Sequence, residues 1–284
     1  MKRYLYVIIT IVIAITIAAC SSDDTNTPIV NVAYEQASAT NGGILYDAFY
    51  STEGGFDQAN SNLAKFKASA DFFRCKQCHG WDLLGTAGSY NSRGPKATRP
   101  NVSALNLFQI AKTKSAQELF DAMKTATNRR DISYDLALYN PTTNSTEGDK
   151  MPNYSQFLTD AQIWDLVKFM KEGAFDVAQL YDASYTGTYP TGKATFSNVG
   201  RDGNAASGNA YYTQKCFICH GADGKTLELE SMTLGKFLRS KANEAQHKIK
   251  HGALGSEMLG NFTISLSQMK DLYKAVADTT VFPN

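Results

Sequence analysis

Four of the five cysteines in this 284-residue chain occur as two pairs, and each pair is followed at once by a histidine. The two sets read CKQCH at residues 75–79 and CFICH at residues 216–220. Thiols at this spacing can form thioether bonds to the two vinyl groups of one porphyrin, and the next histidine can bind the porphyrin iron. The pattern therefore predicts covalent attachment of two haem c groups, one in each half of the chain.

The predicted attachment residues are four thiols and two iron-binding histidines: Cys75, Cys78 and His79 in the first motif, and Cys216, Cys219 and His220 in the second. Other uses of paired cysteines fit less well. Two disulfides could form in an exported protein, but the following histidines point instead to haem. A redox-active C-x-x-C is expected in a thioredoxin-like context. A zinc site would have to pool two pairs that 137 residues separate.

The first twenty residues have the composition of an export signal. A short basic start is followed by a charge-free run at residues 4–19, which is short for a membrane span. The run ends in Ile-Ala-Ala before Cys20, and this ending resembles the lipobox of bacterial lipoproteins. The resemblance implies a signal peptide at residues 1–19, a lipid on Cys20 and a polar tether at residues 20–37. The alternative is an uncleaved anchor helix.

Ser21, directly after this cysteine, resembles the outer-membrane sorting pattern of Gram-negative lipoproteins. The resemblance implies a protein of the cell envelope that is lipid-anchored, in the periplasm or at the outer membrane or cell surface. The lipid would be its contact with the membrane.

The composition is that of a folded, nearly neutral protein. Hydrophobic residues make up 43% and charged residues 19%, which excludes a disordered chain. The formal net charge is +1, and without residues 1–19 the chain has 26 basic and 27 acidic side chains. Nucleic-acid partners favour clustered Lys and Arg, so no nucleic-acid partner is predicted.

The two halves also share a helix start downstream of each motif. Capping boxes occur at residues 159–162 and 265–268, and apolar residues follow at i, i+3, i+4 and i+7. These stripes predict helices that pack one face in a core: Ile163, Leu166, Val167 and Met170 in the first half, and Met269, Leu272, Tyr273 and Val276 in the second. A methionine, Met151 or Met258, precedes the two caps by eight and seven residues.

A glycine and a tyrosine precede the second motif, with Gly208 and Tyr212 eight and four residues before its first cysteine. The first half has a matching pair, Gly42 and Tyr46, farther from its motif, which predicts an insertion at residues 51–68. In the order of opening helix, haem motif, methionine loop and closing helix, each half resembles a class I cytochrome c domain. In that family the glycine lies where the first helix crosses the last.

The resemblance implies an all-α fold of two tandem class I cytochrome c domains, each a few helices around one covalently bound haem. The first domain is expected at residues 38–180 and the second at residues 207–284. Residues 181–206, rich in Gly, Pro, Thr and Ser, are expected to form the linker. The chain shows little alternating strand pattern.

Each haem iron needs a second axial ligand, whose identity sets potential and reactivity. No histidine lies between the two motifs, so Met151, in a Met-Pro loop that resembles the distal loop of the family, is the predicted ligand of the first iron. Met123 and Met170 lie on apolar helix faces and are expected to pack in the core. Lys150 is a remote alternative.

For the second iron, Met258 is the predicted ligand because the two halves should be built alike. Leu259 stands where the family has a proline after the ligand. His247 and His251 remain rival ligands, and a bis-histidine haem would have a lower potential.

Two further residues match features near the haem. Pro100 suits the family's proline whose carbonyl orients the proximal histidine, here His79, and the second half has no such proline until Pro283. Trp81 is expected to pack beside the haem rather than to relay electrons.

Together these features predict a dihaem c-type cytochrome that acts as a membrane-anchored electron carrier or relay in the cell envelope. Its partners would be redox proteins or a membrane oxidoreductase complex, of which it could be the haem module. The alternative is a dihaem enzyme, similar to peroxidases or thiosulfate dehydrogenases, with one labile distal site. Glu257 and His251 could be taken as acid–base groups of such a site. However, no peroxidase pattern occurs, and no cysteine remains to ligate a haem as in thiosulfate oxidation.

Overall fold

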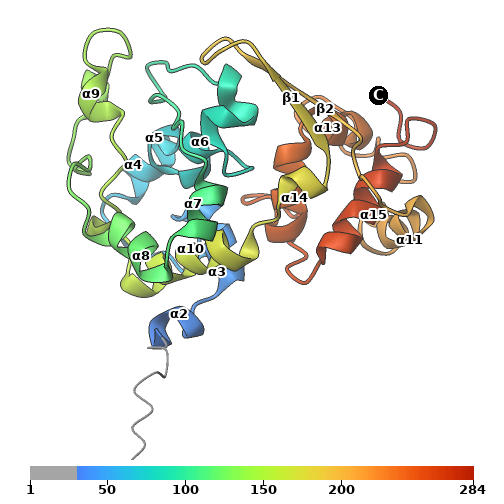
Figure 1. Ribbon diagram of the computed structural model, residues 1–284, viewed down its shortest axis with the longest axis horizontal. Helices are drawn as coiled ribbons and strands as arrows, with labels where there is room; N and C mark the ends of the chain where they lie inside the picture. The colour runs from blue at the N-terminus through green and yellow to red at the C-terminus, as the bar shows by residue number, and fades with distance from the viewer. Residues whose placement is uncertain (1–30) are drawn as a thin grey trace, which may run out of the picture.

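The computed structural model describes residues 31–284. The predicted signal peptide, Cys20 and most of the predicted tether lie outside these residues. Helices dominate the described chain, as predicted, and its one sheet has two strands. Two groups of helices lie side by side, and the β-hairpin runs between them (Figure 1). No helix within residues 31–284 combines the length and apolarity needed to cross a membrane.

The first group of helices, which we call the first half, packs around one hydrophobic core. Its α-helices are α2 (Val32–Gln36), α3 (Ala39–Ala48), α4 (Leu63–Ala68), α5 (Ala70–Phe73), α6 (Cys75–His79), α7 (Leu107–Thr113), α8 (Ala116–Lys124), α9 (Ser145–Gly148) and α10 (Asp160–Lys168). A π-helical turn at Phe169–Gly173 extends α10. Short 3-10 turns lie at Gly85–Ala87, Ser89–Ser92, Leu136–Leu138, Tyr154–Gln156 and Val177–Gln179.

The opening helix α3 crosses the closing helix α10 at Gly42. A Cβ atom on Gly42 would overlap the backbone carbonyl of Asp165 in α10, so only glycine permits this approach. The Asp165 carboxylate accepts hydrogen bonds from Ser38 N (2.6 Å) and Asn41 Nδ2 (2.7 Å) at the start of α3. Thr159 begins α10 with both bonds of the predicted capping box.

The predicted insertion at residues 51–68 folds onto the first core. Phe56 and Phe66 are buried, and their rings meet that of Phe49 edge-on, with centroids 5.6 and 5.2 Å apart. Such pairs add to the free energy gained from burial alone. The insertion therefore adds aromatic residues to the first core.

The segment 181–206 contains two strands, β1 (Asp182–Thr186) and β2 (Lys193–Ser197), which pair antiparallel. The strands read DASYT and KATFS, so polar and apolar residues alternate along each, and Phe196 packs against the core of the following helices. This short alternation, within a segment rich in Gly, Thr and Ser, was not predicted as a hairpin. The side-chain amide of Asn91 donates hydrogen bonds to one carbonyl of each strand, at 3.4 and 3.3 Å. The segment predicted as a linker is thus a hairpin held against the first half.

The second group of helices, which we call the second half, packs around a separate core. Its α-helices are α11 (Ala205–Lys215), α12 (Phe217–His220), α13 (Leu234–Ser240), α14 (Ala242–His251) and α15 (Leu266–Val276). Helix α11 crosses α15 at Gly208, where a Cβ atom would overlap the backbone carbonyl of Asp271. The Asp271 carboxylate accepts a hydrogen bond from Asn204 N (2.7 Å), and Ser265 begins α15 with a complete capping box. This crossing repeats the one between α3 and α10.

Replacing Gly208 by alanine is expected to destabilise the protein by about 2–3 kcal/mol, because the new Cβ must push α11 away from α15. The adjacent exposed position offers a control, since Ser207→Ala should change the stability little. Chemical denaturation of the haem-loaded variants measures both changes in the free energy of unfolding. Equal effects of the two substitutions would contradict the close helix crossing.

Helix α14 of the second half lies against α3 of the first. His247 Nε2 is 3.1 Å from the carbonyl oxygen of Gly43, and the ring of His251 lies so close to Gly43 that a Cβ there would overlap it. Gln246 donates a hydrogen bond to the carbonyl of Trp81 at 2.9 Å. Both histidines are buried, so the two halves share a contact that excludes water.

This contact is expected to weaken in acid. Burial lowers the pKa of His247 to about 3, and the charges of Lys76 and Lys248 add to the effect. An unfolded histidine titrates near pH 6.5, so between these values the unfolded chain binds a proton that the folded chain excludes. The stability contributed by neutral His247 is therefore complete above about pH 6.5 and falls by about 1.4 kcal/mol per pH unit below it, until about pH 3. The free energy of unfolding, measured by denaturation at pH 7 and at pH 5, should differ less for His247→Gln than for the wild type. An equal difference in the two proteins would contradict a buried, neutral His247.

Candidate functional site

The first motif forms a single helical turn, α6, which ends at Gly80 with a positive φ of 79°. Tyr46 of α3 donates a hydrogen bond to the Gly80 carbonyl at 2.7 Å, which fixes the end of the motif to the opening helix. Burial raises the pKa of Cys75 and Cys78 to about 11 and about 12. Burial lowers the pKa of His79 to about 4, so its imidazole is neutral at pH 7, the form that binds a metal.

The Met151 loop lies beside this motif. Arg130 and the loop pair through their backbones, since Arg130 N donates to Met151 O and Asn153 N donates to Arg130 O, both at 2.9 Å. Three residues after Met151, the hydroxyl of Tyr154 is 3.8 Å from Cys75 Sγ and donates to the carbonyl of Phe73 at 2.5 Å. The structure thus brings the loop of the predicted distal ligand next to the predicted attachment thiol.

The other methionines of the first half have the surroundings expected of packing residues. Met123 and Met170 are 8% and 5% exposed and belong to the first core. Met151 is only partly buried and packs against the edge of that core. Lys150, the remote alternative, forms an ion pair with Glu147 at 2.5 Å.

Arg130 is the strongest sign that this site holds an anionic group. Its side chain is 1% exposed, and its Nη2 donates to the carbonyl of Phe72 at 2.6 Å. Its Nε and Nη1 are also buried and have no partner within residues 31–284. A guanidinium stays charged, and an unpaired buried charge costs several kcal/mol. Haem carries two propionate carboxylates, so a haem held by Cys78, which follows Phe72 by six residues, fits the unpaired donors.

Replacing Arg130 by methionine is expected to lower the midpoint potential of the first haem by on the order of 50 mV, because loss of a nearby positive charge favours ferric iron. Redox titration followed by absorbance measures the shift. Arg129→Met, at the adjacent and less buried arginine, should leave the potential unchanged. Equal shifts for both variants would count against an Arg130–propionate pair.

The second motif has the same local geometry as the first. Helix α12 ends at Gly221 with a φ of 75°, and Tyr212 of α11 donates to the Gly221 carbonyl at 2.6 Å. His220 is 7% exposed, and burial lowers its pKa. Cys216 is partly buried against the second core, whereas Cys219 is exposed.

Met258 lies in the loop between α14 and α15. Ala253 N donates to Met258 O at 3.1 Å, and Asn261 N donates to Ile249 O at 2.9 Å, which together close the loop. Met258 is partly buried, and the next residue, Leu259, is 87% exposed. The loop therefore occupies the same place in the chain order as the Met151 loop, before a capped closing helix.

The two rival histidines of the second half point to the first half. The rings of His247 and Trp81 have centroids 5.0 Å apart, and those of His251 and Phe169 are 5.3 Å apart. Both histidines thus contribute to the contact between the halves.

One expected contact is not formed. Pro100 was matched to a proline whose carbonyl accepts a hydrogen bond from the proximal histidine, but Nδ1 of His79 is buried without a partner within residues 31–284. The same segment is tied to the motif differently, because Ser103 N donates to Cys78 O at 3.1 Å. Trp81 is buried, and the ammonium of Lys76 lies 3.8 Å from its ring centroid.

The described chain shows neither a disulfide nor a metal cluster at the two motifs. Cys75, Cys78, Cys216 and Cys219 are free thiols. Residues 31–284 contain no cluster of three His, Cys, Asp or Glu side chains that could hold a metal ion.

The matches to known proteins agree with this geometry. Residues 67–174 match the cytochrome c family, and this segment contains the first motif, the Met151 loop and α10. No curated protein and no solved structure matches the chain. Residues 67–174 form a cytochrome c domain, which implies covalently bound haem c with its iron. The chain therefore contains a c-type cytochrome domain, which supports a role for bound haem c in electron transfer.

Proposed function

We propose that the chain is a lipid-anchored dihaem cytochrome whose two haems form an electron relay in the cell envelope. The second haem would be attached to Cys216 and Cys219, with His220 and Met258 as iron ligands. The first would be attached to Cys75 and Cys78, with His79 and Met151.

The repeated geometry of the two halves is the observation that carries this proposal. In each half a glycine of the opening helix touches the closing helix, Gly42 in α3 and Gly208 in α11. In each half a tyrosine four residues later donates to the carbonyl of the glycine that follows C-x-x-C-H, Tyr46 and Tyr212. A second chain segment with the motif, the helix crossing and the anchoring bond of the first half supports a second haem site.

The residues of each site have roles that suit one-electron transfer. Bound haem iron alternates between the ferric and ferrous states. The buried neutral imidazoles of His79 and His220 can bind iron on one side, and the methionine loops offer thioethers for the other. Six-coordinate iron has no free coordination position for a substrate, so such a haem would exchange only electrons.

The second motif is the better placed to meet an external partner. Its two middle residues, Phe217 and Ile218, are 46% and 89% exposed. The corresponding Lys76 and Gln77 of the first motif are 9% and 6% exposed. We therefore infer that a redox protein or a membrane oxidoreductase complex exchanges electrons with the second haem. Electrons would pass between the second haem and the first within the chain.

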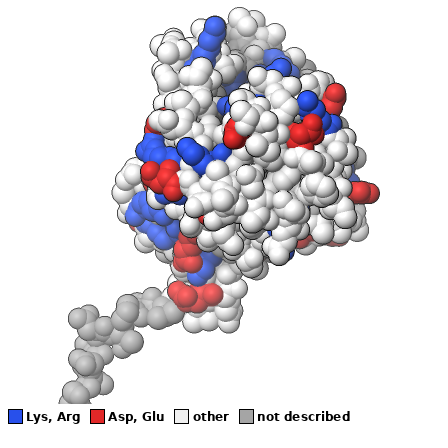
Figure 2. Space-filling view, turned by 90° about the vertical axis from the view of Figure 1, so that its right-hand side faces the viewer, with Lys and Arg blue, Asp and Glu red and all other residues white. Residues whose placement is uncertain are grey.

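We expect a protein partner rather than a nucleic acid, and the charges on one face of the molecule agree with this. On the face shown in Figure 2, basic and acidic side chains are interspersed, and neither sign forms a continuous patch. Nucleic-acid binding requires such a basic patch. Membrane attachment rests on the lipobox at Cys20, and the envelope location follows from it.

Two positions weaken the enzyme alternative. Glu257 is exposed, and the ring of His251 lies against Gly43 of the first half. These groups are therefore not gathered as an acid–base pair over one iron.

Absorption spectra of the reduced protein, with and without carbon monoxide, test the relay. Two low-spin haems that ignore the gas are expected, because both irons should have closed coordination. Ready binding of carbon monoxide by one haem would overturn the relay and favour an enzyme with a labile site.

A further inference from the structure

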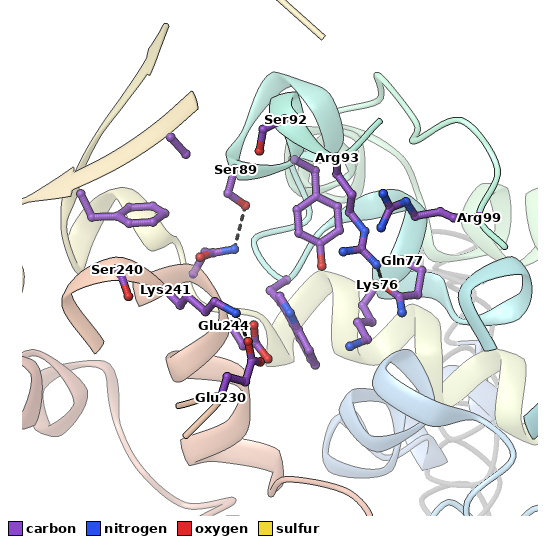
Figure 3. Close-up of a pocket in the computed structure, with 15 residues that line it drawn as sticks. Lys76, Gln77, Ser89, Ser92, Arg93, Arg99, Glu230, Ser240, Lys241 and Glu244 are labelled. Atoms are coloured by element: carbon purple, nitrogen blue, oxygen red, sulfur yellow. Dashed lines mark hydrogen bonds and ion pairs between the residues drawn. The ribbon is translucent and has the colours of Figure 1, made fainter. Parts of the chain in front are cut away.

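Residues of both halves line an open polar cavity with a volume of about 500 Å³. Lys76 and Gln77, the two middle residues of the first motif, belong to its lining. Figure 3 shows Lys76, Gln77, Arg93 and Arg99 on its first-half side, and Lys241 with two glutamates on its second-half side.

The acids of the second half are already paired. Lys241 forms an ion pair with Glu230, and Lys248 forms one with Glu244 at 3.1 Å. These four charges cancel within the second half. The charge that faces a ligand is therefore set by the first half.

The first-half side has more cations than acids. Asp47 pairs with Arg74 and lies 3.6 Å from the ammonium of Lys76, so two cations share one carboxylate. Asp71 lies 3.6 Å from Arg93, and the buried Asp82 accepts a hydrogen bond from Ser89 N at 3.1 Å. The three carboxylates Asp47, Asp71 and Asp82 lie outside the cavity lining, so its first-half side has three cations, Lys76, Arg93 and Arg99, and no carboxylate.

Donors are also left unused. The Nε of Arg93 is buried and has no hydrogen-bond partner within the described residues. The guanidinium of Arg99 donates only to the Gly94 carbonyl, at 3.0 and 2.6 Å, and none of the ion pairs of residues 31–284 includes it. Buried donors normally have partners, and guanidinium groups favour oxyanions.

We propose that this cavity binds a small oxyanion of phosphate or dicarboxylate chemistry on its first-half side. Its oxygens would accept hydrogen bonds from Arg93 and Arg99, and Lys76 would add its charge. The proposal does not depend on a second haem, because Lys76, Arg93 and Arg99 all belong to the first half.

Calorimetric titration of the haem-loaded protein with inorganic phosphate, at low ionic strength, tests the proposal, and titration with succinate distinguishes the two chemistries. One saturable site per chain is expected for at least one of these anions. Arg93→Gln and Arg99→Gln should each weaken binding by about tenfold or more, the effect of losing one charge-assisted hydrogen bond. Lys67→Met, at an exposed lysine remote from the cavity lining, should leave binding unchanged.

Haem content and helicity show whether each variant has folded, and two arginine variants are used so that one misfolded chain does not decide the result. No heat of binding from either anion at millimolar concentration would overturn the proposal. Binding of phosphate or succinate that the folded arginine variants retain at full strength would also overturn the proposal. The same holds if sodium chloride of equal ionic strength abolishes the binding.

Discussion

A chain in which Cys216 and Cys219 are both replaced by alanine is expected to carry half the haem of the wild-type protein. Covalent attachment needs the two thiols, so the second haem should be lost while the first remains on Cys75 and Cys78. The haem absorbance of the alkaline pyridine complex, divided by protein concentration, measures this ratio.

The mirror variant, with Cys75 and Cys78 replaced by alanine, is the matched control. It should also lose half the haem, because the two attachment motifs are independent and lie in halves with separate cores. If the Cys216 and Cys219 variant kept all its haem, the second site would not exist. If it lost all its haem, the two halves could not be loaded separately.

Replacement of Met151 by alanine is expected to open the first haem. Without the thioether its iron should become five-coordinate, and the reduced protein should then bind carbon monoxide at about half its haem. The spectrum of the ferric protein should gain a high-spin component. Absorption spectra with and without the gas measure both changes.

Met123→Ala is the control for packing. Met123 is buried in α8, so its removal should cost about 2–5 kcal/mol of stability without opening an iron. A Met151→Ala protein that ignores carbon monoxide would place the distal ligand elsewhere, with Lys150 next in order. A Met123→Ala protein that binds the gas would exchange the roles of the two methionines.

The repeating parts of the fold were predictable because each rests on a local rule. The capping boxes at Thr159 and Ser265 depend on residues three apart, and both are formed. The close approach of helices at Gly42 and Gly208 needs a residue without a side chain, which the sequence displays directly.

Other features depend on contacts between distant segments. The neighbouring residues in the sequence do not show that Arg130 is buried while Arg129 is less so. The burial of Arg130 follows from its backbone pairing with the distant Met151 loop. The hairpin of β1 and β2 has a short polar–apolar alternation, but its attachment to Asn91 is not encoded in that pattern.

The contact between the halves could not be predicted from the sequence either. His251 appears in the sequence as a histidine near a methionine loop, and only the packing of α14 on α3 shows that it meets Gly43. The cavity lined by Lys76 and Lys241 has the same origin, since residues far apart in the chain form it. Such contacts follow from the arrangement of the halves rather than from any one segment.

The mass of the peptides released by protease from the purified wild-type protein tests the central claim most directly. Two haem peptides are expected, one containing Cys75 and Cys78 and the other containing Cys216 and Cys219, each heavier by the mass of one haem. A peptide of residues 216–220 that is found only with free thiols or as a disulfide would contradict the account of one haem in each half.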